Sequence, residues 1–263
     1  MQTEKIVNHI VNWLTDYLKN SKQKGFVIGI SGGIDSAVTS TLCARTGFPV
    51  LCLDMPIHQA ENQVSRAWNH IEWLKKNFER IEGKTVHLTP VYDEFVKEVE
   101  KSENEYSYNL SLANSRARLR MTSLYYYAGL HGYIVAGTGN KVEDFGVGFF
   151  TKYGDGGVDI SPIADLMKSE VYKIAEFLGI NQEIQKAAPT DGLFGDNRTD
   201  EDQIGANYDE LEWAMKAVEK GQISKDFSGR EREVMEIYEK RHRANLHKMV
   251  PIPVCEIPKE WKI

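Results

Sequence analysis

The sequence predicts an α/β fold in which a parallel sheet of about five strands lies between two layers of helices. Short apolar runs alternate with longer segments of helical periodicity up to about residue 140, and this order is typical of a parallel sheet. A turn rich in glycine and serine follows the first apolar run. Open α/β sheets bind their ligands at such positions, beyond the carboxyl ends of the strands. With 263 residues, 41% of them hydrophobic, the chain can bury one core, so we expect a single domain over residues 1–263.

Changes in periodicity along the chain predict the order of the elements. Ile6, Ile10, Leu14 and Leu18 repeat at helical spacing and predict an N-terminal amphipathic helix over residues 3–19. An α/β core over about residues 25–180 and a helical segment with a proline-rich tail over about residues 190–263 follow. The predicted strands are residues 26–30, 49–54, 85–89 and 133–137. The predicted helices are about residues 35–46, 59–79, 91–101, 110–131, 167–178, 206–219 and 230–244.

Two segments are predicted to be loops. Between residues 146 and 157, glycines are interleaved with Phe149, Phe150 and Tyr153, a composition typical of a loop that closes over a ligand. Residues 191–202 are rich in Gly, Asp, Asn and Arg and lack periodicity, so we expect a mobile flap there.

Composition argues against several classes of protein. A net charge of −6 disfavours a dedicated nucleic-acid-binding protein, which needs a basic face. The chain has no apolar run long enough to cross a membrane, and the acidic, amphipathic N-terminus does not resemble a signal peptide. Cys43, Cys52 and Cys255 form no CxxC motif, which is typical of reduced cysteines in a cytoplasmic protein.

The segment from Ser31 to Ser36, SGGIDS, joins the first predicted strand to a helix. The two glycines allow a sharp turn in which backbone N–H groups converge, and a helix N-terminus adds partial positive charge. The serine hydroxyls can donate to phosphate oxygens, whereas Asp35 is better suited to Mg²⁺. The lysine of a Walker A loop is absent. The segment therefore predicts a pyrophosphate-binding loop.

This segment resembles the PP-loop, SGGxDS, of the ATP pyrophosphatases, enzymes with a Rossmann-like three-layer fold. The resemblance implies that ATP is a co-substrate, cleaved between its α and β phosphates to give AMP and pyrophosphate. Further strings narrow the family: SRARLRM at 115–121, GTGNKVE at 137–143, FFTKYGDGGVD at 149–159, SPI at 161–163 and PT at 189–190. Together they resemble the ammonia-dependent NAD⁺ synthetases from about residue 25 to the C-terminus.

The resemblance implies roles for individual residues. ATP would contact Gly29, Ile30, Ser31, Gly32, Gly33, Ile34, Asp35, Ser36, Thr138, Lys168 and Thr190. Deamido-NAD⁺ would contact Arg118, Lys152, Asp159, His247 and Lys248. Asp35 and Glu143 would bind Mg²⁺, a cation that prefers oxygen ligands. Asp35, Glu143 and Lys168 would be catalytic, and Asp155 is a further candidate for handling ammonium.

Two features near these residues carry separate expectations. Arg116, Arg118 and Arg120 alternate along a helix and cannot share one face, so we expect one of them in the site and the others on the surface. The segment from Glu143 to the FFTKYGDGG string is one residue longer than the family pattern, so the resemblance assigns no role to residues 144–148.

The implied reaction is a carbon–nitrogen ligation, the last step of NAD synthesis. The nicotinate carboxylate of deamido-NAD⁺ would attack the α-phosphorus of ATP, and ammonia would then displace AMP from the acyl-adenylate. A glutamine-using enzyme needs an amidase domain with a nucleophilic cysteine, for which we expect no room upstream of residue 25; an external glutaminase remains an alternative. The resemblance also implies a homodimer with the dinucleotide at the interface.

Three alternatives remain open from the sequence. The chain could be another PP-loop enzyme, such as a GMP-synthetase ATPase subunit or a tRNA-modifying enzyme, although its acidic composition disfavours a tRNA substrate. It could also be an ATP-binding stress-type module that lacks catalysis. The long helix predicted at 110–131, with Leu112, Met121, Leu124, Tyr125, Tyr126 and Tyr127, is either a subunit interface or a core helix.

Overall fold

Four parallel strands form the central sheet, in the order β3-β2-β1-β4. The computed structural model describes residues 1–187 and 199–262, and within them the strands are β1 (Phe26–Gly29), β2 (Val50–Asp54), β3 (Ile81–Thr85) and β4 (Ile134–Val135). The chain runs outward from β1 through β2 to β3 and then crosses to the other side of β1 as β4. The order therefore reverses between β1 and β4, the place where open α/β sheets bind ligands.

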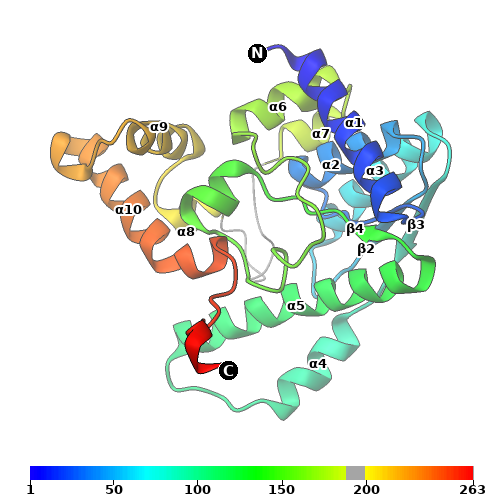
Figure 1. Ribbon diagram of the computed structural model, residues 1–263. Helices are drawn as coiled ribbons and strands as arrows, with labels where there is room; N and C mark the ends of the chain where they lie inside the picture. The colour runs from blue at the N-terminus through cyan, green and yellow to red at the C-terminus, as the bar shows by residue number, and fades with distance from the viewer. Residues whose placement is uncertain (188–198, 263) are drawn as a thin grey trace.

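Helices cover both faces of the sheet (Figure 1). One layer contains α1 (Thr3–Ser21), α2 (Ile34–Arg45), α3 (Glu61–Asn77) and α6 (Lys168–Phe177), and the other contains α4 (Thr89–Glu98) and α5 (Glu105–His131). Alternation along β1 explains the two layers, because Phe26 and Ile28 pack in the first core and Val27 packs in the second. The three-layer α/β fold is confirmed.

A third apolar core lies beside the sheet (Figure 1). It is built by η1 (Val142–Val147), α8 (Asp200–Ile204), α9 (Tyr208–Glu219) and α10 (Gly229–Met249). The short elements are α7 (Gln182–Gln185), η2 (Ser224–Asp226) and η3 (Lys259–Trp261). No helix in residues 1–187 or 199–262 combines the length and apolarity that a membrane span requires.

The strand predicted at 85–89 is wrong. The described part of the chain has four strands rather than about five, and β3 lies at Ile81–Thr85 instead. β3 is an edge strand whose side chains alternate between half-buried and exposed, so it lacks the apolar run of a strand buried on both faces. Leu88 is buried but precedes α4 rather than lying in the sheet.

The boundaries of other segments also differ from the predictions. The helix predicted to start at 110 starts at Glu105, where the Asn104 side chain accepts a hydrogen bond from the backbone N–H of Ser107. The last helix continues to Met249. The predicted flap at 191–202 lies mostly outside the described residues, but its end is ordered, because Thr199 caps α8 through its hydroxyl.

His70 is a buried titratable group in the first core. Its side chain is 1% exposed, its Nε2 lies 2.9 Å from Ser40 Oγ, and its ring stacks on Trp73. Burial lowers the pKa of His70 to about 4, because charging the ring in this core removes hydration. The folded protein therefore holds His70 neutral.

This burial predicts a loss of stability in mild acid. The unfolded chain binds a proton at His70 near pH 6.5 and the folded chain only near pH 4, so the His70 contribution is complete above pH 6.5 and decreases as the pH falls. We expect a decrease of about 3 kcal/mol in the free energy of unfolding, measured by urea denaturation. His70→Gln removes this contribution, so an equal pH slope in the variant would contradict the prediction.

Candidate active site

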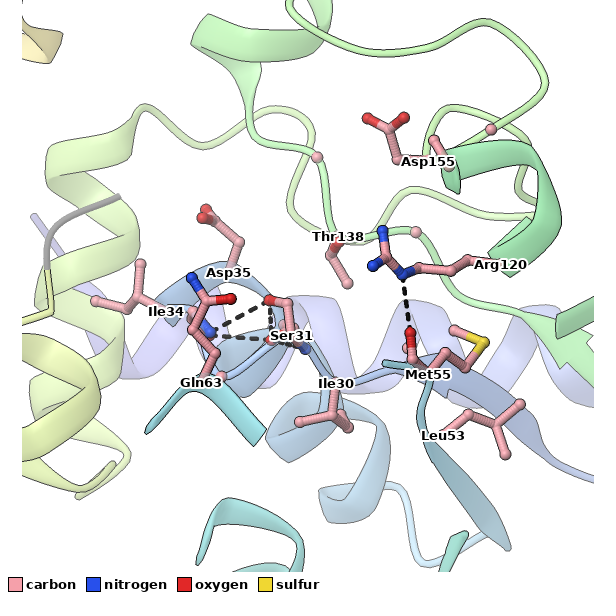
Figure 2. A pocket seen from close by; sticks show the side chains of 18 of the residues that line it. Ile30, Ser31, Ile34, Asp35, Leu53, Met55, Gln63, Arg120, Thr138 and Asp155 are labelled. Atoms are coloured by element: carbon pink, nitrogen blue, oxygen red, sulfur yellow. Dashed lines mark hydrogen bonds between the residues drawn. The ribbon is translucent and has the colours of Figure 1, made fainter. Parts of the chain in front are cut away.

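A cavity of about 270 Å³ opens at the carboxyl ends of β1 and β4. Figure 2 shows Ser31 and Asp35 on one side of this cavity, Thr138 between them and Arg120, and Asp155 across from Asp35. The predicted ATP residues Gly29 to Ser36, Thr138 and Lys168 all line the cavity, and so do Glu143 and Asp155. Thr190 lies outside the described residues. The structure therefore brings the described part of the predicted ATP site together.

The turn after β1 is ordered by its own serines (Figure 2). Ser36 Oγ accepts from the backbone N–H of Ser31 at 3.3 Å and donates to the carbonyl of Gly33 at 3.0 Å. Ser31 Oγ accepts from the backbone N–H of Gly33 at 3.2 Å. The turn points the N-terminus of α2 at the cavity, where backbone N–H groups and the helix dipole favour an anion.

Gly32 is required by this turn for two reasons. Its φ of +79° lies in the left-handed region, which side chains disfavour. A Cβ atom at this position would also lie 2.9 Å from the carbonyl oxygen of Gln63 in α3. The loop is therefore packed against α3 with no space for a side chain.

Lys168, the first residue of α6, joins the two predicted metal ligands. Its Nζ lies 2.6 Å from Asp35 Oδ2 and 3.0 Å from Glu143 Oε1. The lysine side chain is 3% exposed, and those of Asp35 and Glu143 are 17% and 16% exposed. These residues come from α2, η1 and α6. One cation therefore holds two carboxylates from distant parts of the chain.

Asn140 and Tyr208 also bind these two carboxylates. Asn140 Nδ2 donates to Asp35 Oδ1 at 3.1 Å, and Asn140 Oδ1 accepts from the backbone N–H of Glu143 at 3.2 Å. The Tyr208 hydroxyl lies 2.6 Å from Glu143 Oε1 and 3.2 Å from Asp200 Oδ2. Our sequence interpretation missed both residues, although Asn140 lies inside the GTGNKVE string.

Burial and pairing shift the pKa values of the three charged groups. Burial raises the pKa of Asp35, against the opposing effect of the Lys168 ammonium. Burial also acts to raise the pKa of Glu143, but Lys168 and the Tyr208 hydroxyl outweigh it and lower that pKa. Burial acts to lower the pKa of Lys168, and the two carboxylates outweigh it and raise that pKa. Lys168 is therefore a permanent cation.

The carboxylate pair is suited to Mg²⁺. Asp35 Oδ2 and Glu143 Oε1 both lie within 3.0 Å of the Lys168 ammonium, so a single cation can contact both oxygens. The residues that the structure describes contain no cluster of three or more His, Cys, Asp or Glu side chains that could bind a metal. Mg²⁺ is commonly held by one or two carboxylates, with phosphates and water completing the shell. The residues present therefore suit a metal that arrives with a nucleotide.

A second cavity, of about 180 Å³, adjoins the first. Both are lined by Asp144, Asp155, Gly137, Gly139 and Val158. Burial, followed by the charges of Glu143, Asp155 and Asp35, raises the pKa of Asp144 to about 8. Asp144 therefore carries a proton at neutral pH. The Asp155 carboxylate accepts from the backbone N–H of Thr151 at 2.9 Å and lies at the junction of the two cavities.

The segment between Glu143 and Phe149 forms most of a π-helical turn, η1. The backbone N–H groups of Gly148 and Phe149 both donate to the carbonyl of Glu143. A π-turn contains more residues than an α-turn and is frequent at functional sites. The start of the loop predicted at 146–157 is therefore helical. The η1 turn also carries Glu143 and Asp144, which both line the cavity.

The residues predicted to bind deamido-NAD⁺ divide into three groups. Lys152, Arg118 and His247 form the first group. The Lys152 carbonyl accepts from Arg118 at 3.3 Å, and Lys152 Nζ donates to the carbonyl of His247 at 2.7 Å. Lys248 Nζ donates to the carbonyls of Gly148 and Phe150 and lines the second cavity. Asp159 does not line either cavity, because its carboxylate accepts from the Tyr125 hydroxyl and the backbone N–H of Val135.

Of the three alternating arginines, Arg120 lines the larger cavity. Its Nε donates to the carbonyl of Met55 at 3.0 Å (Figure 2). Its Nη2 donates to Gln59 Oε1 at 2.8 Å. Arg116 lies over the ring of Tyr92, 4.6 Å from its centroid. The alternation predicted that only one arginine would serve the cavity, but it did not identify Arg120.

Comparisons with known proteins agree with this geometry. The NAD synthase family model matches residues 6–251. The NH(3)-dependent NAD(+) synthetase of Archaeoglobus fulgidus is 36% identical, and the match covers 94% of this chain and 96% of that protein. Among solved structures, the NMN synthetase of Francisella tularensis has a TM-score of 0.82 at 32% identity, with 98% and 99% of the two chains covered. The NH3-dependent NAD synthetase of Campylobacter jejuni has a TM-score of 0.78 at 28% identity, covering 97% and 100%. The match over residues 6–251 and these relatives show that the chain belongs to the NAD synthase family.

Proposed function

We propose that the protein is an ammonia-dependent NAD⁺ synthetase, which uses ATP and ammonia to convert deamido-NAD⁺ to NAD⁺. The observation that carries this proposal is one cavity lined by the PP-loop, in which Asp35 of that loop and Glu143 lie within reach of one cation. Membership of the NAD synthase family supports deamido-NAD⁺ as the acid substrate, in preference to the substrates of other PP-loop enzymes. It also disfavours the non-catalytic ATP-binding module.

In the first step, the nicotinate carboxylate attacks the α-phosphorus of ATP. A new P–O bond forms, the bond between the α-phosphorus and the bridging oxygen breaks, and pyrophosphate leaves. The backbone N–H groups at the start of α2 and the Lys168 ammonium stabilise the departing charge. Bound at Asp35 and Glu143, Mg²⁺ would neutralise phosphate charge.

In the second step, ammonia attacks the acyl carbon and AMP leaves. The nitrogen loses one proton, for which the Asp155 carboxylate at the junction of the two cavities is the proposed acceptor. The glycine-rich segment, residues 146–157, lines the second cavity with Phe150, Asp155 and Gly156. It would restrict water, which hydrolyses an acyl-adenylate.

A second candidate acid is nicotinate mononucleotide. The relative from Francisella tularensis is named an NMN synthetase, and it matches almost the full length of both chains. The chemistry would be the same amidation, but the substrate lacks the adenylate half of deamido-NAD⁺. Asp159, predicted to contact deamido-NAD⁺, has both carboxylate oxygens bonded within the protein, which favours testing the smaller acid directly.

We further propose a cytoplasmic homodimer. Cys43 and Cys52 are free and buried, and Cys255 is free and exposed, as expected in a reducing compartment. α5 is a core helix on one side, where Leu112, Leu124 and Tyr127 pack against the sheet. On its other side Tyr126 is 64% and Leu130 is 61% exposed, and such apolar side chains are common in subunit interfaces.

The α5 surface predicts the oligomeric state. Tyr126→Glu combined with Leu130→Glu should convert a dimer to a monomer, because two charges would have to be buried in the interface, and light scattering after gel filtration measures the mass. Phe177→Glu, on the opposite helix layer and 47% exposed in the parent side chain, is the matched control. A monomeric parent protein would refute the dimer.

The acid substrate is tested by pyrophosphate release from ATP with Mg²⁺ and ammonium. Deamido-NAD⁺ should support release together with formation of NAD⁺ and AMP. A kcat/KM for nicotinate mononucleotide higher by about tenfold, or roughly 1.4 kcal/mol in transition-state binding, would assign the second candidate instead. Release with xanthosine monophosphate and with neither nicotinate nucleotide would overturn both assignments.

Gly32→Ala should separate loop geometry from general stability. We expect kcat/KM for ATP to fall by about tenfold or more, because the loop must shift away from the Gln63 carbonyl. Gly47→Ala is the control: Gly47 has a φ of +75°, but no atom lies within 4 Å of a Cβ there. Gly47→Ala should lose about 1 kcal/mol of stability through its positive φ, and Gly32→Ala should lose at least as much. Equal catalytic effects in the two variants would show that the loop clash is unimportant.

A further inference from the structure

Lys168 occupies the position between the two carboxylates that a shared metal ion would take. Its ammonium is within 3.0 Å of both Asp35 Oδ2 and Glu143 Oε1, and it also lies 4.7 Å from the centroid of the Tyr208 ring. Two carboxylates with one ammonium leave a net charge of −1 in a nearly buried site. A divalent cation entering beside the ammonium would meet a like charge at short range, which is unfavourable at low dielectric.

The two carboxylates have hydrogen-bond partners other than the ammonium. Asn140 holds Asp35 through Oδ1, the oxygen that does not contact Lys168. Tyr208 holds Glu143 from α9. Lysine carries its charge on a flexible four-carbon stem, and Lys168 lines the same cavity as the PP-loop. The ammonium can therefore move toward an anion in that cavity while the carboxylates stay in place.

We propose that Lys168 is an internal counter-ion that competes with the divalent metal for Asp35 and Glu143. The metal then binds well only together with ATP, whose phosphates accept the displaced ammonium. This inference rests on the proposed metal site, and it adds that metal and nucleotide bind cooperatively. Lys168 serves as a positioning group for the empty site and as a phosphate ligand in the filled one.

The first test measures Mn²⁺ binding without nucleotide, by electron paramagnetic resonance of the free ion. Lys168→Met leaves two carboxylates without their cation, so we expect Mn²⁺ to bind about tenfold more tightly or better than to the parent protein. Lys141→Met is the matched control, because Lys141 also pairs with two carboxylates, Asp165 and Glu219, outside the cavity. Unchanged affinity in a folded Lys168→Met protein would overturn the proposal.

The second test uses the parent protein and does not depend on the variant folding. MgCl₂ alone should leave the thermal midpoint unchanged, whereas MgCl₂ with a non-hydrolysable ATP analogue should raise it above the value with the analogue alone. An equal rise with MgCl₂ alone would overturn the counter-ion role. Asp35→Asn should lose the metal-dependent rise; if it does not, the metal assignment fails, which is a different outcome from failure of the Lys168 variant alone.

Discussion

The buried ion pairs of Lys168 with Asp35 and Glu143 connect parts of the chain that share no local sequence. Lys168 begins α6 in the first core, Asp35 belongs to the PP-loop and lies in the first turn of α2, and Glu143 lies in η1, which packs in the third core. Burying charges is costly unless each one is paired and hydrogen-bonded. Asn140 and Tyr208 supply the required hydrogen bonds to the carboxylates. The site therefore also connects the sheet to the C-terminal helices.

The placement of the cavity follows from the sheet topology. β1 and β4 are neighbours, and the chain leaves them in different directions, so the PP-loop and the segment after β4 face each other across the crevice. One wall presents the N-terminus of α2, whose backbone N–H groups favour an anion, and the opposite wall carries Glu143, Asp144 and Asp155. This arrangement suits a phosphate and a cation between the walls, and the second cavity adjoins this space at Asp144 and Asp155.

The helices and their amphipathic faces could be predicted well because periodicity is local. α1 and α6 were expected within one or two residues of their observed bounds, since apolar side chains at helical spacing must face a core. β3 could not be predicted in this way. An edge strand is half exposed, so the chain needs no apolar run there, and the more apolar segment after Thr85 leads into a helix instead.

The sequence by itself determined the α/β class, the position of the glycine- and serine-rich turn and the family, because each is carried by local patterns of neighbouring residues. Only the tertiary structure decided which distant groups meet. Lys168 and Asp35 are 133 positions apart, and nothing in a lysine at the start of a helix indicates that it pairs with two buried carboxylates. Tyr208 and Arg120 were likewise missed, and Asp159 faces the backbone of β4 rather than either cavity. The direction of a side chain depends on how the helices pack on the sheet, and that packing is a property of the whole chain.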